Sequence, residues 1–223
     1  MHPTQARDAA VLIVARDAAA GMEIYMLRRS SAARAFPDAY VFPGGAVDEA
    51  DRTPAARAQL AGPWRPDEHE FTYAAIRETF EECGLLFADA PVDEQRLRAA
   101  RTQLLAKTRT FPGVVDELGV RLDARAVHYY ARRIAPPTAE HRFDVRFFVA
   151  ELPHGQAAEA DDGETSGGRW VRPAEMVAAA EAQTVRILPP TVLYLRRLAE
   201  FAGTGALLAF AAEQRTIEPD RRS

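Results

Sequence analysis

The segment from Phe71 to Ala88, FTYAAIRETFEECGLLFA, constrains the fold more than any other part of the chain. Its apolar residues Ile76, Phe80 and Cys83 fall at positions i, i+4 and i+7, which predicts a helix with one apolar stripe. Gly84 near the end of the segment is a typical stop signal for such a helix. The stripe predicts that one side of this helix packs into a core.

The same helix carries three glutamates, Glu78, Glu81 and Glu82, at positions i, i+3 and i+4. Side chains with this spacing share one face and lie within about 6 Å of each other along the helix axis. Packed carboxylates raise each other's pKa unless a cation intervenes, and magnesium prefers oxygen ligands of this kind. Two interpretations are open: a metal site, or a solvated acidic face partly neutralised by arginines such as Arg77.

The rest of the sequence predicts mixed α and β structure around one sheet. Strands are predicted at 9–17, at 22–30 (antiparallel to the first), before a Pro-Gly-Gly turn at 43–45, at 126–134, at 142–152 and at the end of 163–173. Helices are predicted at 91–108, 111–120, 173–182, 188–203 and 206–214. In the first of these, Asp93 and Glu94 in the first turn and Lys107 in the last turn suit the helix dipole.

Composition excludes several classes of partner. The net charge of −4 provides no basic surface for nucleic acid, and no apolar run approaches the ~20 residues that span a membrane. Cys83 is the single cysteine, so no internal disulfide forms, and the N-terminal stretch has no basic leader or cleavage site. These features predict a cytoplasmic protein.

A second motif lies before the glutamate helix, in FPGGAVDEAD. Its double glycine allows a close approach of the backbone and exposes carbonyl groups that can ligate a metal ion. Together the two motifs resemble the signature of the Nudix hydrolases. The matching positions are Gly45, then Asp51 after five residues, and later Arg77, Glu78, Glu81, Glu82, Gly84 and Leu85. This chain departs from the family signature in three ways. Asp51 replaces a Glu, and Thr79 replaces an apolar residue. Residues 52–76 replace a gap of seven residues, so about 18 residues are inserted inside the motif.

An insertion at this place is typical of a Nudix subgroup that includes coenzyme A diphosphatases. The stretches RSSAARAFPDAYVFPGG and IAPPTAEHRFDVRFFVAEL also resemble that subgroup. The resemblance implies the α/β class and one Nudix-type domain over 1–223, an α/β/α sandwich with a mixed central sheet. Within it we expect an insertion at about 52–70 and a C-terminal helical extension at about 188–214.

The resemblance also implies a site for Mg²⁺ or Mn²⁺. Glu78 and Glu82 would be the principal ligands, with Glu81 and the carbonyl of Gly45 completing the set. Arg77 would hold a motif carboxylate in place with Asp51 as its partner. The general base is open between a glutamate of the motif, such as Glu81, and Glu164 in a later loop.

The implied substrate is a small-molecule nucleoside diphosphate derivative. Coenzyme A or acyl-coenzyme A is the first expectation, and ADP-ribose or NADH is the alternative. Arg28, Arg34 and Arg142 are candidates to bind its phosphates, although each also suits a surface charge or a structural ion pair. A non-catalytic module that senses a nucleotide is the alternative from another functional class. Many family members are dimers, so a homodimer is also expected.

Overall fold

The computed structural model describes residues 6–33, 36–63, 68–139, 142–161 and 165–213. Within these residues a mixed eight-stranded sheet forms the centre, in the order β10-β3-β2-β1-β8-β7, with β4 paired to β1 and β9 paired to β2. Its strands are β1 (Arg7–Ala18), β2 (Gly21–Arg29), β3 (Ala39–Val41), β4 (Gly44–Ala46), β7 (His128–Ile134), β8 (Phe143–Glu151), β9 (Thr165–Val171) and β10 (Arg186–Ile187). β5 (Leu60–Ala61) and β6 (Leu122–Asp123) form a separate parallel pair.

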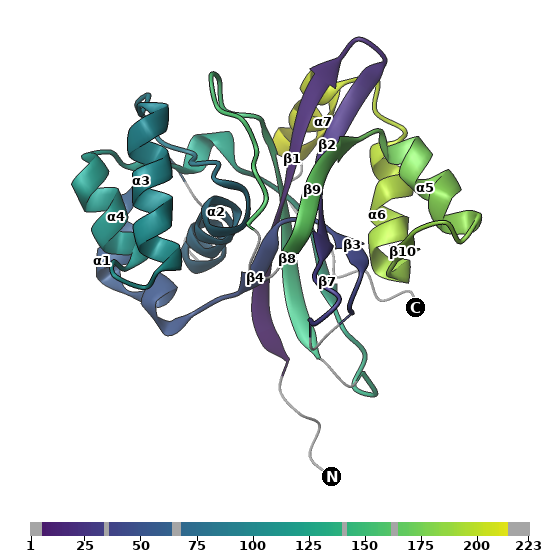
Figure 1. Ribbon diagram of the computed structural model, residues 1–223, viewed down its shortest axis with the longest axis horizontal. Helices are drawn as coiled ribbons and strands as arrows, with labels where there is room; N and C mark the ends of the chain where they lie inside the picture. Colours follow the sequence, from purple (N-terminus) through teal and green to yellow (C-terminus); the bar gives the residue numbers. More distant parts are fainter. Residues whose placement is uncertain (1–5, 34–35, 64–67, 140–141, 162–164, 214–223) are drawn as a thin grey trace.

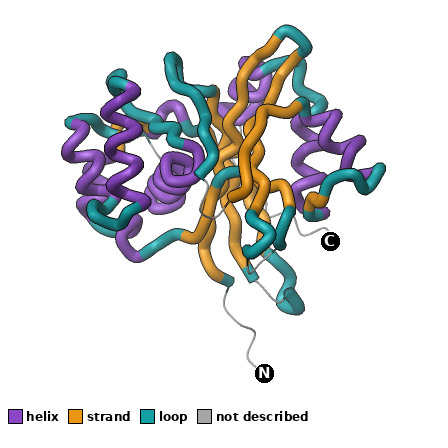
Figure 2. The backbone as a smooth tube through the Cα atoms, viewed as in Figure 1, coloured by secondary structure: helices purple, strands orange, loops and turns teal. Residues whose placement is uncertain are grey.

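Helices cover both faces of the sheet, as Figures 1 and 2 show. One layer contains α1 (Pro54–Gln59), α2 (His69–Cys83), α3 (Glu94–Leu105) and α4 (Phe111–Leu118), and the other contains α5 (Pro173–Glu181), α6 (Pro189–Leu198) and α7 (Thr204–Glu213). Two 3-10 turns, η1 (Glu49–Arg52) and η2 (Ala124–Ala126), complete the set. This arrangement confirms the predicted α/β/α sandwich with a mixed central sheet.

Strand β1 organises both cores. It pairs antiparallel with β2 and parallel with β8, so it lies in the interior of the sheet. Because successive side chains of a strand point to opposite faces, Leu12 and Val14 belong to the core under α2, whereas Ile13 and Ala15 belong to the core under α6 and α7. A strand buried on both faces needs a continuous apolar run, and AAVLIVA supplies it.

Helix α2 has the predicted form. Ile76, Phe80 and Cys83 are fully buried, which confirms the apolar stripe. The helix ends at Gly84, whose φ of 71° is left-handed and whose N–H donates to the Phe80 carbonyl. Glycine takes this backbone conformation without steric cost, so the predicted stop signal is also confirmed.

The second helical layer is held mainly by apolar contacts. The rings of Phe147 on β8 and Tyr194 on α6 have centroids 4.2 Å apart, and Leu198 and Leu207 are fully buried beside them. None of the helices in the described residues combines the length and the apolar character that a membrane span requires.

Two local predictions are wrong. Gly44 and Gly45 do not form a turn, because both lie in β4, where they pair with Val11 and Ala10 of β1. Lys107 does not lie in the last turn of α3, which ends at Leu105, and Asp93 caps that helix instead of lying within its first turn. Short-range propensity favours a turn at Gly-Gly, but pairing with β1 overrides it here.

Candidate active site

A cavity of about 580 Å³ lies where β4, α2, the end of α3 and the start of β9 meet. Its walls combine glutamates of α2 with backbone of β4 and with residues from the later parts of the chain. They are Arg29, Gly44, Gly45, Ala46, Asp48, Arg77, Glu78, Glu81, Glu82, Leu104, Leu105, Lys107, Asp161 and Thr165. The cavity therefore collects the conspicuous residues of both sequence motifs.

Arg77 is the structural centre of this cavity wall. Its Nε and Nη2 donate to the two oxygens of the fully buried Asp51 at 2.9 and 2.8 Å, its Nη1 donates to Glu78 Oε1 at 2.7 Å, and its Nη2 donates to the Ala46 carbonyl at 3.0 Å. Asp51 also accepts the Asp48 N–H. A planar guanidinium suits this fork because it forms several fixed hydrogen bonds at once. The expected pairing of Arg77 with Asp51 is thus observed, and it links η1 to α2.

Gly45 lies directly against the carboxylate of Glu78. A Cβ atom at position 45 would lie 2.5 Å from Glu78 Cδ and 2.5 Å from Glu78 Oε1. Any side chain there would displace the glutamate, so the glycine provides the space in which Glu78 sits. Its neighbour Gly44 has a φ of 149° and packs against the β1 backbone, where a Cβ would lie 2.3 Å from the Ala10 carbonyl oxygen.

Glu82 is held from the same strand, because its Oε2 accepts the Gly44 N–H at 2.9 Å. The carbonyl groups at the end of α2 are occupied by a later segment. The N–H groups of Glu159 and Asp161 donate to the carbonyls of Cys83 and Glu82, each at 2.9 Å. Arg101 on α3 adds hydrogen bonds to the carbonyls of Glu81 and Glu159. The segment 152–161 is thereby docked on the carboxyl end of α2.

Burial controls the electrostatics of the cavity. It raises the pKa of Glu78 to about 7, while Arg77 acts in the opposite direction and Glu81 raises the value further. Burial likewise raises the pKa of Glu81, against the lowering effect of Arg77. For Arg77 itself burial lowers the pKa, but the hydrogen bonds to Asp51 and the charges of Glu78 and Asp51 outweigh it, so the pKa rises overall.

The donor set suits a hard divalent cation. Glu78, Glu81 and Glu82 line one cavity together with Gly44 and Gly45, and magnesium takes one or two protein carboxylates together with water and phosphate oxygens. The raised pKa of Glu78 has the same implication, because a nearby cation would offset the cost of a buried negative charge. In the described residues, no three His, Cys, Asp or Glu side chains are so arranged that together they could hold a metal ion. The residues therefore fit a cation that shares its coordination with substrate.

Two of the three predicted substrate-binding arginines, Arg28 and Arg142, do not line this cavity. Arg28 forms an exposed ion pair with Asp38 at 2.9 Å, and Arg142 donates to the Ala135 carbonyl at 3.3 Å; neither lines the cavity. The candidates Arg34 and Glu164 lie outside the described residues. Arg77, Glu78, Glu81, Glu82 and Gly45 are the predicted site residues that the structure brings together.

Arg29, the neighbour of Arg28, is a better candidate for a substrate-binding arginine. Arg29 lines the cavity, and it shares its strand parity with Tyr25 and Leu27, which belong to the core under α2. The period of two along β2 would therefore have favoured Arg29 over Arg28. No sequence pattern predicts that Leu104, Leu105 and Lys107 line the cavity, because only the path of α3 brings them there.

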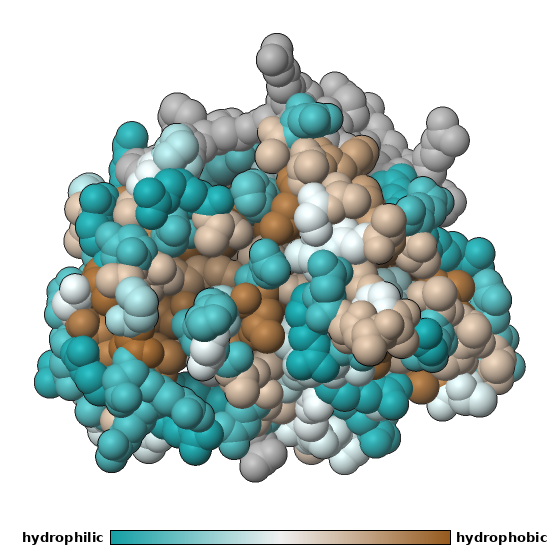
Figure 3. All heavy atoms as spheres, turned by 90° about the horizontal axis from the view of Figure 1, so that it is seen from above, coloured by the Kyte–Doolittle hydropathy of each residue, from teal (hydrophilic) through white to brown (hydrophobic). Residues whose placement is uncertain are grey.

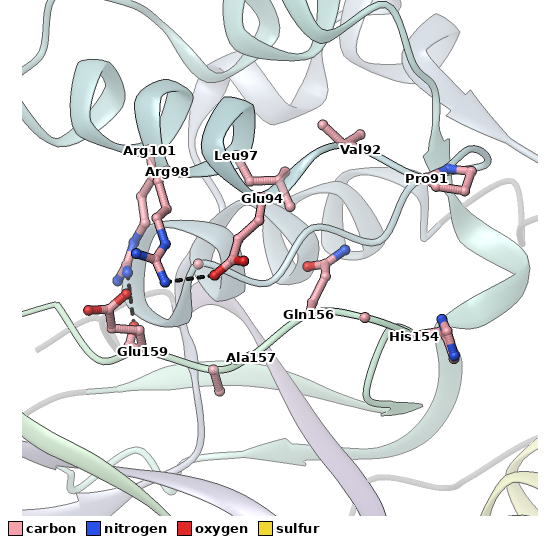
Figure 4. Close-up of a pocket in the computed structure, with 13 residues that line it drawn as sticks. Pro91, Val92, Glu94, Leu97, Arg98, Arg101, His154, Gln156, Ala157 and Glu159 are labelled. Atoms are coloured by element: carbon pink, nitrogen blue, oxygen red, sulfur yellow. Dashed lines mark hydrogen bonds and ion pairs between the residues drawn. The ribbon is translucent and has the colours of Figure 1, made fainter.

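A second cavity, of about 520 Å³, lies between the first part of α3 and the segment 154–159 (Figure 4). Pro91, Val92 and Leu97 form its apolar wall. Three of its charged residues are already engaged, because Arg98 pairs with Glu94 at 2.6 Å and Arg101 binds backbone carbonyls.

From above, apolar surface gathers on the α1–α4 side of the molecule, with hydrophilic residues around it (Figure 3).

Comparison with known proteins identifies the family. The sequence model of the NUDT19 Nudix domain matches residues 54–198, a segment that contains all of α2 with its three glutamates. The chain belongs to this family. The resemblance to Nudix hydrolases, and to their coenzyme A diphosphatase subgroup, is confirmed.

Several curated Nudix relatives match over most of the chain. A putative nudix hydrolase 7 from Caenorhabditis elegans is 29% identical over 177 residues, which cover 79% of this chain and 56% of that protein. The human acyl-coenzyme A diphosphatase NUDT19 is 27% identical over 241 residues, which cover 86% of this chain and 64% of that protein. The chain thus spans less than two thirds of the length of these relatives.

A solved structure supports the Nudix fold. The crystal structure of a NUDIX hydrolase from Alicyclobacillus acidocaldarius has a TM-score of 0.75 and 24% sequence identity, over 97% of this chain and 99% of that one. At this identity the likeness concerns the fold, which is the Nudix sandwich described above.

Proposed function

We propose that this chain is a divalent-metal-dependent Nudix hydrolase that cleaves the diphosphate of a nucleoside diphosphate derivative. One observation carries the proposal: the buried Arg77–Asp51 pair holds Glu78 in a cavity that Glu81 and Glu82 also line. The raised pKa of Glu78, about 7 through burial, agrees with this proposal, because strongly shifted carboxylates in a cavity concentrate at functional sites.

Each residue of the site has a proposed part in the reaction. Glu78, Glu81, Glu82 and the Gly45 carbonyl would hold Mg²⁺ or Mn²⁺, which when bound would neutralise phosphate charge and activate water. Arg77 would orient Glu78, which lines the cavity, through its 2.7 Å hydrogen bond to Oε1.

The general base remains a choice between two glutamates. Glu81 lines the cavity, and burial raises the pKa of its carboxyl, which is the direction that favours a general base. Glu164 is the second candidate; Asp161 and Thr165, which flank it in the sequence, line the same cavity.

We propose coenzyme A or acyl-coenzyme A as the substrate. The support is the match to the NUDT19 Nudix domain and the similarity to proteins named acyl-coenzyme A diphosphatase. ADP-ribose or NADH is the second candidate, because these compounds contain the same diphosphate that the cavity is proposed to bind.

Product analysis by chromatography and mass spectrometry tests the reaction. The protein is incubated with Mg²⁺ and, separately, with coenzyme A, ADP-ribose and NADH. Adenosine 3′,5′-bisphosphate and phosphopantetheine from coenzyme A are the expected products. Cleavage of ADP-ribose or NADH alone would keep the reaction type and reject coenzyme A. Binding without turnover of any of them, with Mg²⁺ and then Mn²⁺, would favour a nucleotide-sensing module.

The variant Glu82→Gln tests the site assignment. Losing this carboxylate charge should lower kcat by about a hundredfold or more and weaken Mg²⁺ activation. Glu94→Gln is the matched control, because Glu94 is exposed on α3 and pairs with Arg98 outside the cavity. Steady-state kinetics over a Mg²⁺ series measures both effects, and unchanged turnover in Glu82→Gln would reject this assignment.

A further inference from the structure

One wall of the catalytic cavity is built from residues that belong to neither sequence motif. Leu104 and Leu105 at the end of α3, and Lys107 two residues further on, line the same cavity as the glutamates of α2. This wall differs chemically from the opposite one, because it offers apolar carbon and one ammonium group where α2 offers carboxylates.

The charge of the cavity explains why an ammonium group matters there. Five carboxylates line the cavity: Asp48, Glu78, Glu81, Glu82 and Asp161. A diphosphate that enters meets this negative charge. The basic residues of the cavity are Arg29, Arg77 and Lys107, and Arg77 is already committed to Asp51, Glu78 and the Ala46 carbonyl. Lys107 is exposed, and among the described residues its side chain has no hydrogen-bond or ion-pair partner. Its ammonium group is therefore available to an anionic ligand.

The backbone at Lys107 has a defined conformation at the end of α3. The Lys107 N–H donates to the Leu104 carbonyl and the Thr108 N–H donates to the Gln103 carbonyl, at 2.9 and 3.0 Å. This pair of bonds is the Schellman motif, whose left-handed position is usually occupied by glycine. Lys107 occupies that position with a φ of 56°. α5 ends in the same way, with Gln183 at a φ of 56°, so this conformation fixes the backbone at Lys107 without requiring glycine.

Leu105 adds an apolar surface beside the lysine. It is one of three large hydrophobic side chains that are exposed in the described residues, with 41% of its surface accessible. An exposed leucine on a cavity wall has apolar surface left to bury against a ligand. A ligand that combines phosphate with an apolar body matches both residues.

We propose that the end of α3 is a substrate-recognition wall, in which Lys107 binds a phosphate oxygen and Leu105 contacts the part of the substrate beyond the diphosphate. This assignment rests on the proposed diphosphate hydrolysis. It adds two substrate-contacting residues from outside the Nudix motif.

Chemical labelling tests the lysine directly, because Lys107 is the only lysine in the chain. An amine-acetylating reagent then modifies Lys107 and the α-amino group, and the α-amino group serves as the internal reference. The probes are NADH and S-methyl-coenzyme A, whose blocked thiol does not consume reagent, each with Mg²⁺. At about ten times its Kd, a bound probe should slow acetylation of Lys107 about tenfold relative to the α-amino group, as peptide mass spectrometry measures.

Labelling and turnover separate the two proposals. Protection of Lys107 without hydrolysis would support the recognition wall and reject the hydrolase. Hydrolysis with unprotected Lys107 would support the hydrolase and overturn the wall, and unprotected Lys107 without hydrolysis would overturn both.

Kinetics of variants complete the test. Lys107→Met should raise KM about tenfold, and Lys107→Arg should restore much of the loss because it keeps the charge. Arg109→Gln is the matched control, since Arg109 pairs with Glu117 at 3.3 Å and does not line the cavity. Leu105→Ala should raise KM for coenzyme A, and an unchanged KM would overturn the apolar half of the proposal.

Discussion

At the scale of single residues, the cavity depends on how Glu78 is enclosed. Its carboxylate lies between the Arg77 guanidinium, which donates at 2.7 Å, and the backbone of Gly45. The arginine stabilises the charged form of Glu78, whereas burial destabilises it, and burial has the larger effect. The protonation state of Glu78 in the metal-free protein is therefore sensitive to pH near neutrality.

The pH dependence of stability follows from this pKa. Because the pKa of Glu78 rises from 4.5 to about 7 on folding, the folded protein holds a proton between these values that the unfolded chain has lost. The free energy of unfolding should thus fall as pH rises across this window, by on the order of 3 kcal/mol. Urea unfolding in EDTA at pH 5 and pH 7 measures it. Glu78→Gln should remove this part of the slope, and an identical slope in both proteins would contradict the prediction.

Gly45→Ala tests the space that Glu78 requires. The added methyl group would lie 2.5 Å from the Glu78 carboxylate carbon, so the glutamate has to move. We expect a loss of kcat together with a destabilisation of about 1–3 kcal/mol. Gly205→Ala is the control, because a Cβ there has no atom within 4 Å. Equal kinetics and thermal unfolding in both variants would show that the cavity tolerates the methyl group.

At the scale of elements, the carboxyl end of α2 is completed by other segments. The carbonyls of Glu82 and Cys83 accept the N–H groups of Asp161 and Glu159, and Arg101 reaches across from α3 to the carbonyl of Glu81. Carbonyl groups at a helix end need partners of this kind. One arginine thus connects α2, α3 and the segment that brings Asp161 to the cavity.

Arg101→Ala should loosen this connection. It removes two hydrogen bonds to Glu81 and one to the Glu159 carbonyl, and hydrogen bonds to a charged donor contribute about 1.5–3 kcal/mol each at most. Hydrogen exchange at the Glu159 and Asp161 amides should accelerate. Arg98→Ala is the control one turn earlier, where the arginine is exposed and pairs with Glu94. Equal exchange in the two variants would mean that the backbone bonds alone hold the segment.

At the scale of the whole molecule, β1 connects two cores. One core contains α2 and the other contains α6 and α7, and alternate residues of β1 belong to each. The division into a motif insertion and a C-terminal extension stays a prediction. The structure shows that α6 and α7 supply fully buried residues, Leu198 and Leu207, to the core beside β1 and β8.

Leu207→Ala tests whether the two cores unfold together. Removing a fully buried leucine side chain should lower the free energy of unfolding by about 2–5 kcal/mol. Because β1 is shared, we expect one cooperative transition by both circular dichroism and tryptophan fluorescence. Leu208→Ala, at the half-buried neighbour, should have a smaller effect. Separate transitions by the two probes would show that the second layer unfolds by itself.

The sequence by itself determined the features that depend on residues close together in the chain. The periodicity of 71–88 specified the buried stripe of α2, and the same periodicity placed Glu78, Glu81 and Glu82 toward one side. The resemblance to the Nudix motif also implied Asp51 as the partner of Arg77, although residues 52–76 separate them. The pattern within α2 can be deduced from the sequence because it depends only on positions along one helix, whereas the pairing with Asp51 in η1 followed from the family motif.

Tertiary structure alone decided which distant segments meet at the cavity. Gly45 provides space for Glu78 only because β4 pairs with β1 beside α2, and Lys107 reaches the cavity only because α3 packs across the end of α2. Arg28 and Arg29 are neighbours on β2 and point to opposite faces of the sheet. Arg29 therefore lines the cavity, whereas Arg28 forms an ion pair with Asp38. Neither propensity nor spacing encodes such contacts, because they depend on how whole elements pack, and packing is a property of the assembled core.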